Sequence, residues 1–265
     1  MKNLLILPVL CILLIAAVSS CSKEYSASGT AHTITPKEDS FNLSINFIPM
    51  VDTLKLNFDS TYHNYWKEEY KVSAFKFYVS SFDLINTDSG RVYHLDTAKC
   101  FLVDAADSTT WAVKLLAPVF VYNRISFLIG LDSARNVSGV KTGALDPANG
   151  MYWSQSAGYI MAKLEGSSPV APGNTIQYNI GGFSGINNVL RKPTLLFPFG
   201  NFLQVSATPG SKSIINISAN TNAWFFNPHQ IKIETNPSCT TAGPMAKDIS
   251  ENYSKMFSVD TVMSK

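Results

Sequence analysis

Short runs of alternating hydrophobic and polar residues fill most of the chain. In FNLSINF, residues 41–47, every second residue is phenylalanine, leucine or isoleucine, and LKLNF at 54–58 repeats the pattern. Further runs of this kind are FKFYVSSFDLI, VYHL, CFLVDA, NRISFLIGL, YIMAKLEG, TIQYNIGGF and SIINISA. A period of two, with β-branched and aromatic residues between turn-forming clusters, is typical of half-buried strands. We therefore predict an all-β fold, a single-domain β-sandwich with long loops.

The best helical pattern lies near the C-terminus, in SENYSKMFSV at residues 250–259. We predict a short C-terminal helical turn there. The segments RNVSG at 135–139 and DPANG at 146–150 combine residues that favour turns, so both are predicted to be turns.

The first 40 residues differ from the rest of the chain. Lys2 is followed by an apolar stretch at 4–18 and by VSSC, which ends at Cys21. This order resembles a bacterial lipobox, with cleavage before Cys21 and lipid on its sulfur, although an ordinary signal peptide with a chance cysteine remains open. We predict a signal peptide at 1–20, a lipid-anchored flexible tether at 21–40 and a folded domain at 41–265.

The composition argues against several classes of function. Only 15% of the residues are charged and the formal net charge is +2, so nothing predicts a nucleic-acid partner. Metalloprotease, Walker and dinucleotide-binding motifs are absent from the sequence, and GGFSG lacks the second glycine of a nucleophile elbow because Ile186 occupies that position. Nothing pairs the carboxylates of Asp132, Asp146 and Glu165 across a cleft. We therefore predict that the protein is not an enzyme.

Cysteines and histidines give no clear metal motif. Whether Cys100 and Cys239 form a disulfide or stay two buried thiols is left open by the sequence. The histidines are His32, His63, His94 and His229, and no two of them stand at a sequence spacing typical of metal ligands.

One long segment resembles a known family. FLIGLDSARNVSGVKTGALDPANGMYWSQSAGYIMAKLEG, residues 127–166, is similar to the I-G-[VL]-D-S, N-x-S-G, G-A-L-D-P-x-x-G-M-[FY]-W and K-L-E-G patterns of the MbnP-like proteins. The segments VSAFKFYVSSFDL, CFLVDAADS, YNIGGFSG and NYSKMFSVD resemble further family patterns in the same order. Many such proteins are lipoproteins of Bacteroidetes-type bacteria. The resemblance implies a β-sandwich in the cell envelope, and the absence of aspartate after Cys21 favours the outer membrane.

The resemblance also implies a copper site, but several of the residues expected to bind copper are replaced in this sequence. Family members are thought to bind copper through histidines and an oxidised tryptophan of a W-x-W motif, made by a dihaem peroxidase-like partner protein. Here Trp153 matches the first tryptophan, but the second is Gln155. The expected histidines are replaced by Pro49, Asn179 and Thr261. Neither a proline side chain nor a neutral amide is a good ligand for Cu(I).

Two hypotheses follow for the function. The first is a lipid-anchored binding protein with a degenerate copper site, whose binding surface consists of Tyr152, Trp153, Gln155, Tyr159 and Asn179. The alternative is a working copper protein with a remodelled site around Trp153. Its further ligands would come from His63, His94, Met50 or Met151.

Overall fold

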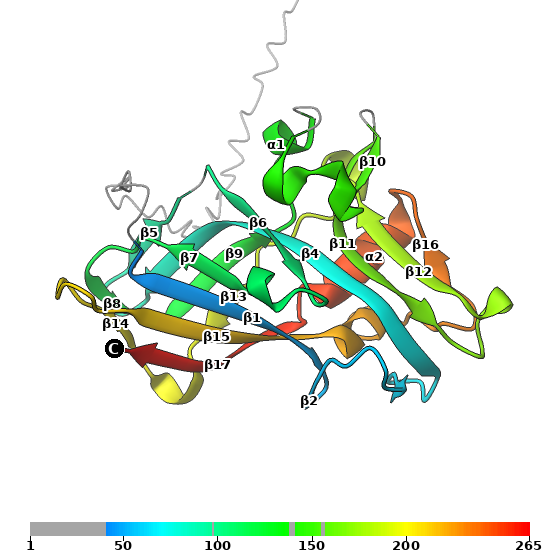
Figure 1. Cartoon of the computed structure of the whole chain (residues 1–265), viewed down its shortest axis with the longest axis horizontal. Helices are drawn as coiled ribbons and strands as arrows, with labels where there is room; N and C mark the ends of the chain where they lie inside the picture. Colours follow the sequence, from blue (N-terminus) through cyan, green and yellow to red (C-terminus); the bar gives the residue numbers. More distant parts are fainter. Residues whose placement is uncertain (1–40, 97, 138–140, 155–156) are drawn as a thin grey trace, which may run out of the picture.

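The computed structural model describes residues 41–96, 98–137, 141–154 and 157–265 of the chain. Within them, two sheets pack face to face, so the predicted all-β sandwich is confirmed (Figure 1). The predicted signal peptide and the tether with Cys21 lie outside the described residues, as does Gln155. No helix of the described part is both long and apolar enough to cross a membrane.

The small sheet has the strand order β17-β15-β1-β2, with β7 also paired to β1. Strands β1 and β15 run parallel, although the sequence separates them by more than 150 residues, and β15 pairs with β17 in the antiparallel direction. The bounds are β1 Leu43–Val51, β2 Leu54–Lys55, β7 Ala112–Leu115, β15 Ser213–Asn220 and β17 Phe257–Ser264.

The large sheet has the strand order β13-β9-β4-β11-β12-β16, and the long strand β4 is its centre. Strands β3, β5 and β6 pair with β4, and β10 pairs with β11. The bounds are β3 Tyr62–His63, β4 Glu69–Asn86, β5 Arg91–His94, β6 Cys100–Asp104, β9 Arg124–Ile129, β10 Tyr152–Ser154, β11 Gly158–Ser167, β12 Ile176–Gly181, β13 Thr194–Leu196 and β16 Ser238–Cys239. A separate ribbon joins β8 Phe120–Tyr122 to β14 Leu203–Val205.

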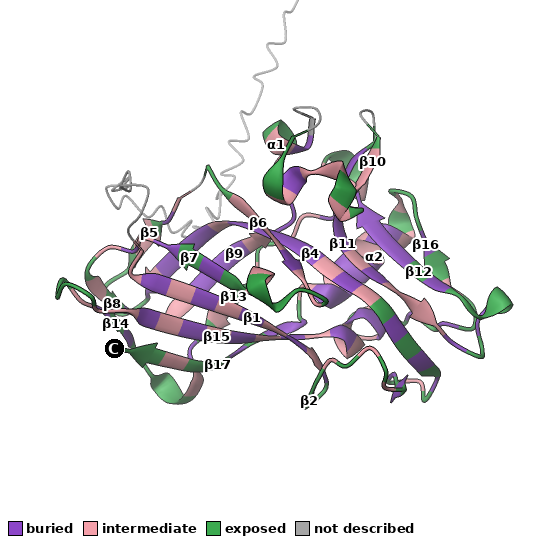
Figure 2. Ribbon diagram, viewed as in Figure 1, coloured by how far each residue is buried: buried purple, intermediate pink, exposed green. Residues whose placement is uncertain are grey.

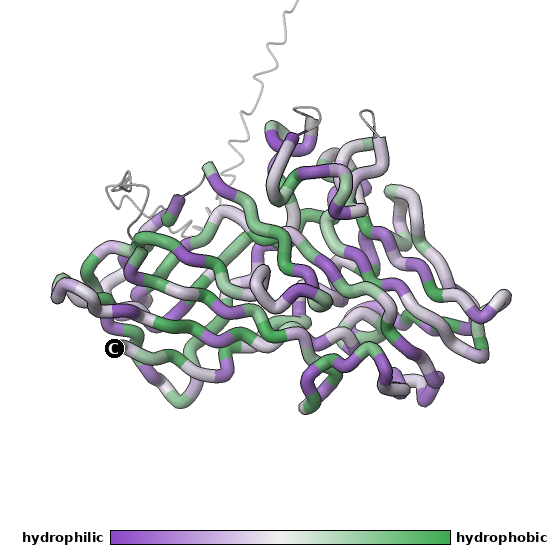
Figure 3. Tube along the Cα trace, viewed as in Figure 1, coloured by the Kyte–Doolittle hydropathy of each residue, from purple (hydrophilic) through white to green (hydrophobic). Residues whose placement is uncertain are grey.

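Aromatic side chains fill the space between the two sheets. Phe47 of β1 is fully buried, and its ring meets those of Phe77 on β4, Phe127 on β9 and Phe257 on β17. Buried and less buried residues alternate along β1 and β15, as Figure 2 shows, and hydrophobic residues are frequent in both strands in Figure 3. The alternation that predicted these strands therefore comes from one face packing on the core and the other facing outward.

The C-terminal helix is present, but its bounds differ from the prediction. Helix α2 spans Pro244–Tyr253, and the strand β17 begins at Phe257. The proline lies in the first turn, where its missing N–H group costs nothing. Residues 257–259 were wrongly included in the helix, because Phe257 and Val259 are buried on one face of a strand while Ser258 is exposed.

The prediction of a turn at 135–139 is also partly wrong. Residues up to Val137 belong to helix α1, Ser133–Val137, and Asp132 accepts a hydrogen bond from the backbone N–H of Arg135 at 2.9 Å. The predicted turn at 146–150 is confirmed, since Asp146 accepts from the N–H of Ala148 and Gly150 ends the turn with a positive φ. Both aspartates therefore stabilise local backbone structure.

The two cysteines that could have formed a disulfide are free thiols. Cys100 lies on β6 and Cys239 on β16, at opposite sides of the large sheet in Figure 1. Burial raises the pKa of both thiols above the usual value, because the thiolate form is poorly solvated there.

Candidate functional site

The aromatic segment predicted to form a binding surface lies at one corner of the large sheet. Strand β10 pairs with β11 and places Tyr152 opposite Tyr159, with 4.9 Å between the ring centroids. Tyr159 is fully buried, and its hydroxyl donates to the carbonyl of Leu145 at 2.8 Å. Desolvation raises the pKa of this phenol. Tyr159 therefore attaches the loop at 143–150 to the sheet, and only Tyr152 and Trp153 of the three aromatics are partly exposed.

The indole of Trp153 lies against the backbone of Gly181 at the end of β12. A Cβ atom built on Gly181 would fall 2.5 Å from the Cζ3 atom of Trp153 and 3.0 Å from the carbonyl oxygen of Tyr159. No larger residue fits there without moving the ring. The GGF run at residues 181–183 is therefore a point of close approach between backbone and side chain.

Trp153 lines a cavity of about 430 Å³. Most of the other lining residues come from the loop after β12 and from the residues after β16. The lining residues are Trp153, Ala157, Gly182, Phe183, Ser184, Asn187, Thr240, Thr241 and Ala242. The lining residues that the structure describes carry no formal charge, and they combine two aromatic rings with hydroxyl and amide groups. This combination is common in sites for small ligands.

Asn179 lies two residues before Gly181 and thus on the same face of β12. Its side chain is buried, and its Oδ1 atom has no hydrogen-bond partner. Across the sheet it faces Lys163 of β11, which faces Lys76 of β4. Lys76 pairs with Asp104 at 2.8 Å. A polar row therefore crosses the outer face of the large sheet, and Asn179 is its member with an unused acceptor.

The positions at which the family resemblance implies copper ligands do not come together. Pro49 is buried on the same face of β1 as Phe47, between the two sheets. Asn179 is on the other face of the large sheet, because Lys76 of the same polar row alternates with the core residues of β4. Thr261 is exposed on β17 and accepts a hydrogen bond from Asn216 at 2.8 Å. These residues do not fit a copper ion, either in donor chemistry or in position.

The histidines that were alternative copper ligands also lie away from Trp153. The Nδ1 atom of His94 on β5 is 2.7 Å from the carboxylate of Asp83, and β5 and β10 lie in opposite halves of the molecule (Figure 1). His63 lines a different cavity, of about 700 Å³, which shares no lining residue with the Trp153 cavity. Of the two candidate methionines, Met151 is fully buried and Met50 is partly buried on β1.

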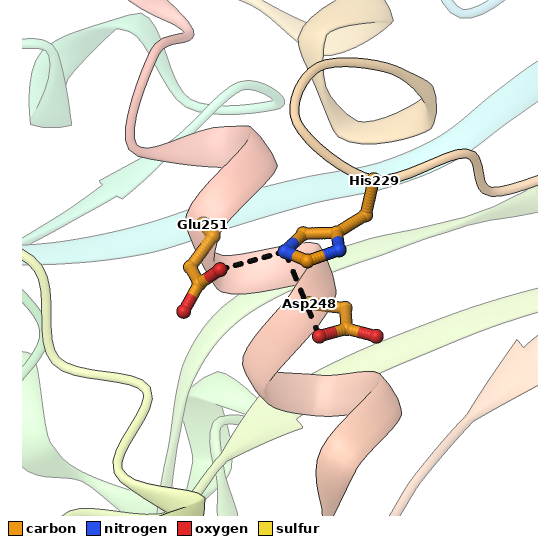
Figure 4. Close-up of side chains that lie close together, drawn as sticks. All are labelled: His229, Asp248 and Glu251. Atoms are coloured by element: carbon orange, nitrogen blue, oxygen red, sulfur yellow. Dashed lines mark hydrogen bonds and ion pairs between the residues drawn. The ribbon is translucent and has the colours of Figure 1, made fainter.

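The fourth histidine is part of a cluster that the sequence analysis missed. Within the part of the chain that the structure describes, a single group of three His, Cys, Asp or Glu side chains brings its ligand atoms within 4.8 Å of one another. It consists of His229 and of Asp248 and Glu251 on helix α2 (Figure 4). The signal that could have revealed it is the i, i+3 spacing of the two carboxylates, but the predicted helix began at Ser250 and excluded Asp248.

Fold and site together define an all-β sandwich protein with an uncharged aromatic cavity at the edge of its large sheet. The chain belongs to the MbnP family, whose family model, described as MbnP, matches residues 40–241. Among solved structures, the chain is similar to MbnP from Methylosinus trichosporium, with 13% identity and a TM-score of 0.46 over 74% of this chain and 82% of that chain. No curated protein matches it. The family predicted from residues 127–166 is confirmed.

Proposed function

We propose that this member of the MbnP family is a binding protein of the cell envelope, not an enzyme, and that it holds a small ligand in the cavity beside Trp153. The observation that carries the proposal is the placement of the indole against Gly181, which fixes one wall of the cavity. In this account the family's copper site is degenerate. The replacements at Pro49, Asn179 and Thr261 and their separation in the fold support this.

The lining residues favour an uncharged ligand with one apolar face. The rings of Trp153 and Phe183 provide surfaces for stacking, and Ser184, Asn187 and Thr240 carry groups that donate and accept hydrogen bonds. A charged ligand would lose its hydration with no opposite charge among the described lining residues to compensate. A neutral aromatic or sugar-like molecule suits this lining.

Replacement of Trp153 tests the cavity as the binding site. We expect uncharged aromatic and sugar fragments to show saturation-transfer NMR signals with the full-length chain, and their carboxylated analogues to show much weaker ones. Trp153→Ala should abolish these signals, because it removes a stacking surface, while Trp153→Phe should retain part of them. Tyr65→Ala, at the other cavity, serves as the control and should change nothing. Equal signals in the Trp153→Ala and original chains would contradict the proposal.

The membrane attachment has its own test. We propose that lipid on Cys21 holds the protein in the cell envelope, on the outer membrane, and that residues 22–40 separate the domain from the surface. Cys21→Ala should move the protein from the membrane fraction to the soluble fraction, as judged by fractionation and immunoblotting. A variant at a cysteine of the fold, Cys100→Ala, should stay in the membrane fraction. Retention of Cys21→Ala in the membrane would rule out the lipid anchor.

A further inference from the structure

The His229 cluster lies in the C-terminal part of the fold, and buried hydrogen bonds hold the histidine in place. The fully buried side chain of Asn252 on α2 accepts a hydrogen bond from the N–H of His229 at 2.8 Å and donates to the carbonyl of His229 at 2.8 Å. It also donates to the carbonyl of Trp224 at 3.0 Å. The backbone of His229 is thus fixed to the helix, and the orientation of the imidazole does not depend on its own contacts alone.

Both carboxylates of the cluster come from one face of α2. Asp248 and Glu251 are three residues apart, so their side chains lie one turn apart on the same side of the helix (Figure 4). The Nε2 atom of His229 lies 2.6 Å from an oxygen of Glu251 and 3.6 Å from an oxygen of Asp248. One nitrogen and two carboxylate oxygens therefore converge around a point that is partly open to solvent.

The carboxylate of Glu251 is oriented by cations on its far side. Lys247 donates to its Oε1 atom at 2.6 Å, and Arg191 lies 3.4 Å from the same oxygen. The other oxygen, Oε2, is left to face His229. Outer hydrogen bonds of this kind orient carboxylates that ligate metals.

We propose that His229, Asp248 and Glu251 form a binding site for one divalent transition-metal ion of the zinc type. An imidazole with two carboxylates suits Zn²⁺ and similar ions of intermediate softness. Water would complete the coordination on the exposed side, as in zinc sites with three protein ligands. The two positive charges beside Glu251 lower the affinity, so this is a site of exchangeable metal.

The distances from His229 to the two carboxylates lie on either side of the value that a bound ion requires. In a tetrahedral zinc site with bonds of about 2.0 Å, two ligand atoms lie roughly 3.3 Å apart. The separation of 3.6 Å between His229 and Asp248 is near that value, and the 2.6 Å between His229 and Glu251 is a hydrogen bond that the ion would replace. All three side chains are partly exposed, which leaves room for the rotations that this geometry requires.

Isothermal titration of the purified, metal-free full-length chain with ZnCl₂ tests the site. We expect one Zn²⁺ per chain, and a loss of affinity of about tenfold or more in His229→Gln, Asp248→Asn and Glu251→Gln. The matched control is His94→Gln, since His94 also contacts a carboxylate, that of Asp83 at 2.7 Å, but belongs to no such group of three among the residues that the structure describes. It should bind Zn²⁺ as the original chain does.

Asp248→Asn is the decisive variant, because it removes a ligand charge and leaves the bonds between Asn252 and the backbone of His229 in place. The unfolding midpoint is measured for every variant, and we expect each variant to keep the fold. The proposal is overturned if the original chain does not bind Zn²⁺, or if Asp248→Asn and His94→Gln have equal effects. Trp153→Ala should leave Zn²⁺ binding unchanged, which separates this site from the proposed ligand cavity.

Discussion

Replacing Phe47 with alanine is expected to lower the free energy of unfolding by about 3–5 kcal/mol, the usual cost of removing a large buried ring. The side chain is fully buried between the sheets. Its ring centroid lies 5.2 Å from that of Phe127 and 5.8 Å from that of Phe257, with edge-to-face geometry. It therefore joins β1 of the small sheet to β9 of the large one, and its loss leaves a cavity at the centre of the sandwich.

Denaturant titration of the Phe47→Ala chain measures this effect. Leu54→Ala is the control, since Leu54 is a large hydrophobic residue on neighbouring β2 that is 65% exposed. Leu54→Ala should change the free energy of unfolding by no more than about 0.5 kcal/mol, as most surface substitutions do. If both substitutions cost the same, the aromatic cluster does not hold the two sheets together.

The second large effect is expected at Glu68, directly before β4. Its buried carboxylate accepts hydrogen bonds from the backbone N–H groups of Ile233 at 2.8 Å and Glu234 at 3.0 Å, and from the amide of Asn64 at 2.6 Å. Glu68→Ala leaves these donors without a partner, and each unsatisfied buried donor costs about 1–3 kcal/mol. A loss of about 3 kcal/mol or more follows.

Glu69→Ala is the matched control for this substitution, because the neighbouring side chain is exposed. Hydrogen exchange provides a local readout. The amides of Ile233 and Glu234 should exchange faster in Glu68→Ala and at the original rate in Glu69→Ala. Unchanged protection at Ile233 would show that Glu68 does not anchor this segment.

The strands could be predicted from sequence because each sheet has one face on the core. β1 and β15 alternate between buried and partly buried positions over their whole length, and this is the pattern that a period of two encodes. The pairing of these two strands could not be predicted, since no local signal connects segments so distant along the chain. The C-terminal helix was predicted too far along the chain. The hydrophobic residues Met256 and Phe257 extend its periodic pattern, although Phe257 already belongs to a strand.

The proximity of the three aromatic residues could be predicted because one segment contains them. Tyr152, Trp153 and Tyr159 are close in sequence, and β10 and β11 bring them together in the fold. The rest of the cavity comes from loops after β12 and β16, and the His229 cluster combines a loop with a helix. Such groupings depend on tertiary packing, which residue spacing does not encode.

A competition titration of the full-length chain with Cu(I), against a colorimetric chelator, tests most directly whether the MbnP fold here persists without its copper site. The account predicts no tight one-to-one binding, because Pro49, Asn179 and Thr261 offer no soft ligand and lie apart. His229→Gln should be titrated in parallel, so that weak binding at the His229 cluster is recognised. Tight one-to-one binding that survives in His229→Gln and disappears in Trp153→Phe would contradict the account and show that copper is bound at a rebuilt site around Trp153.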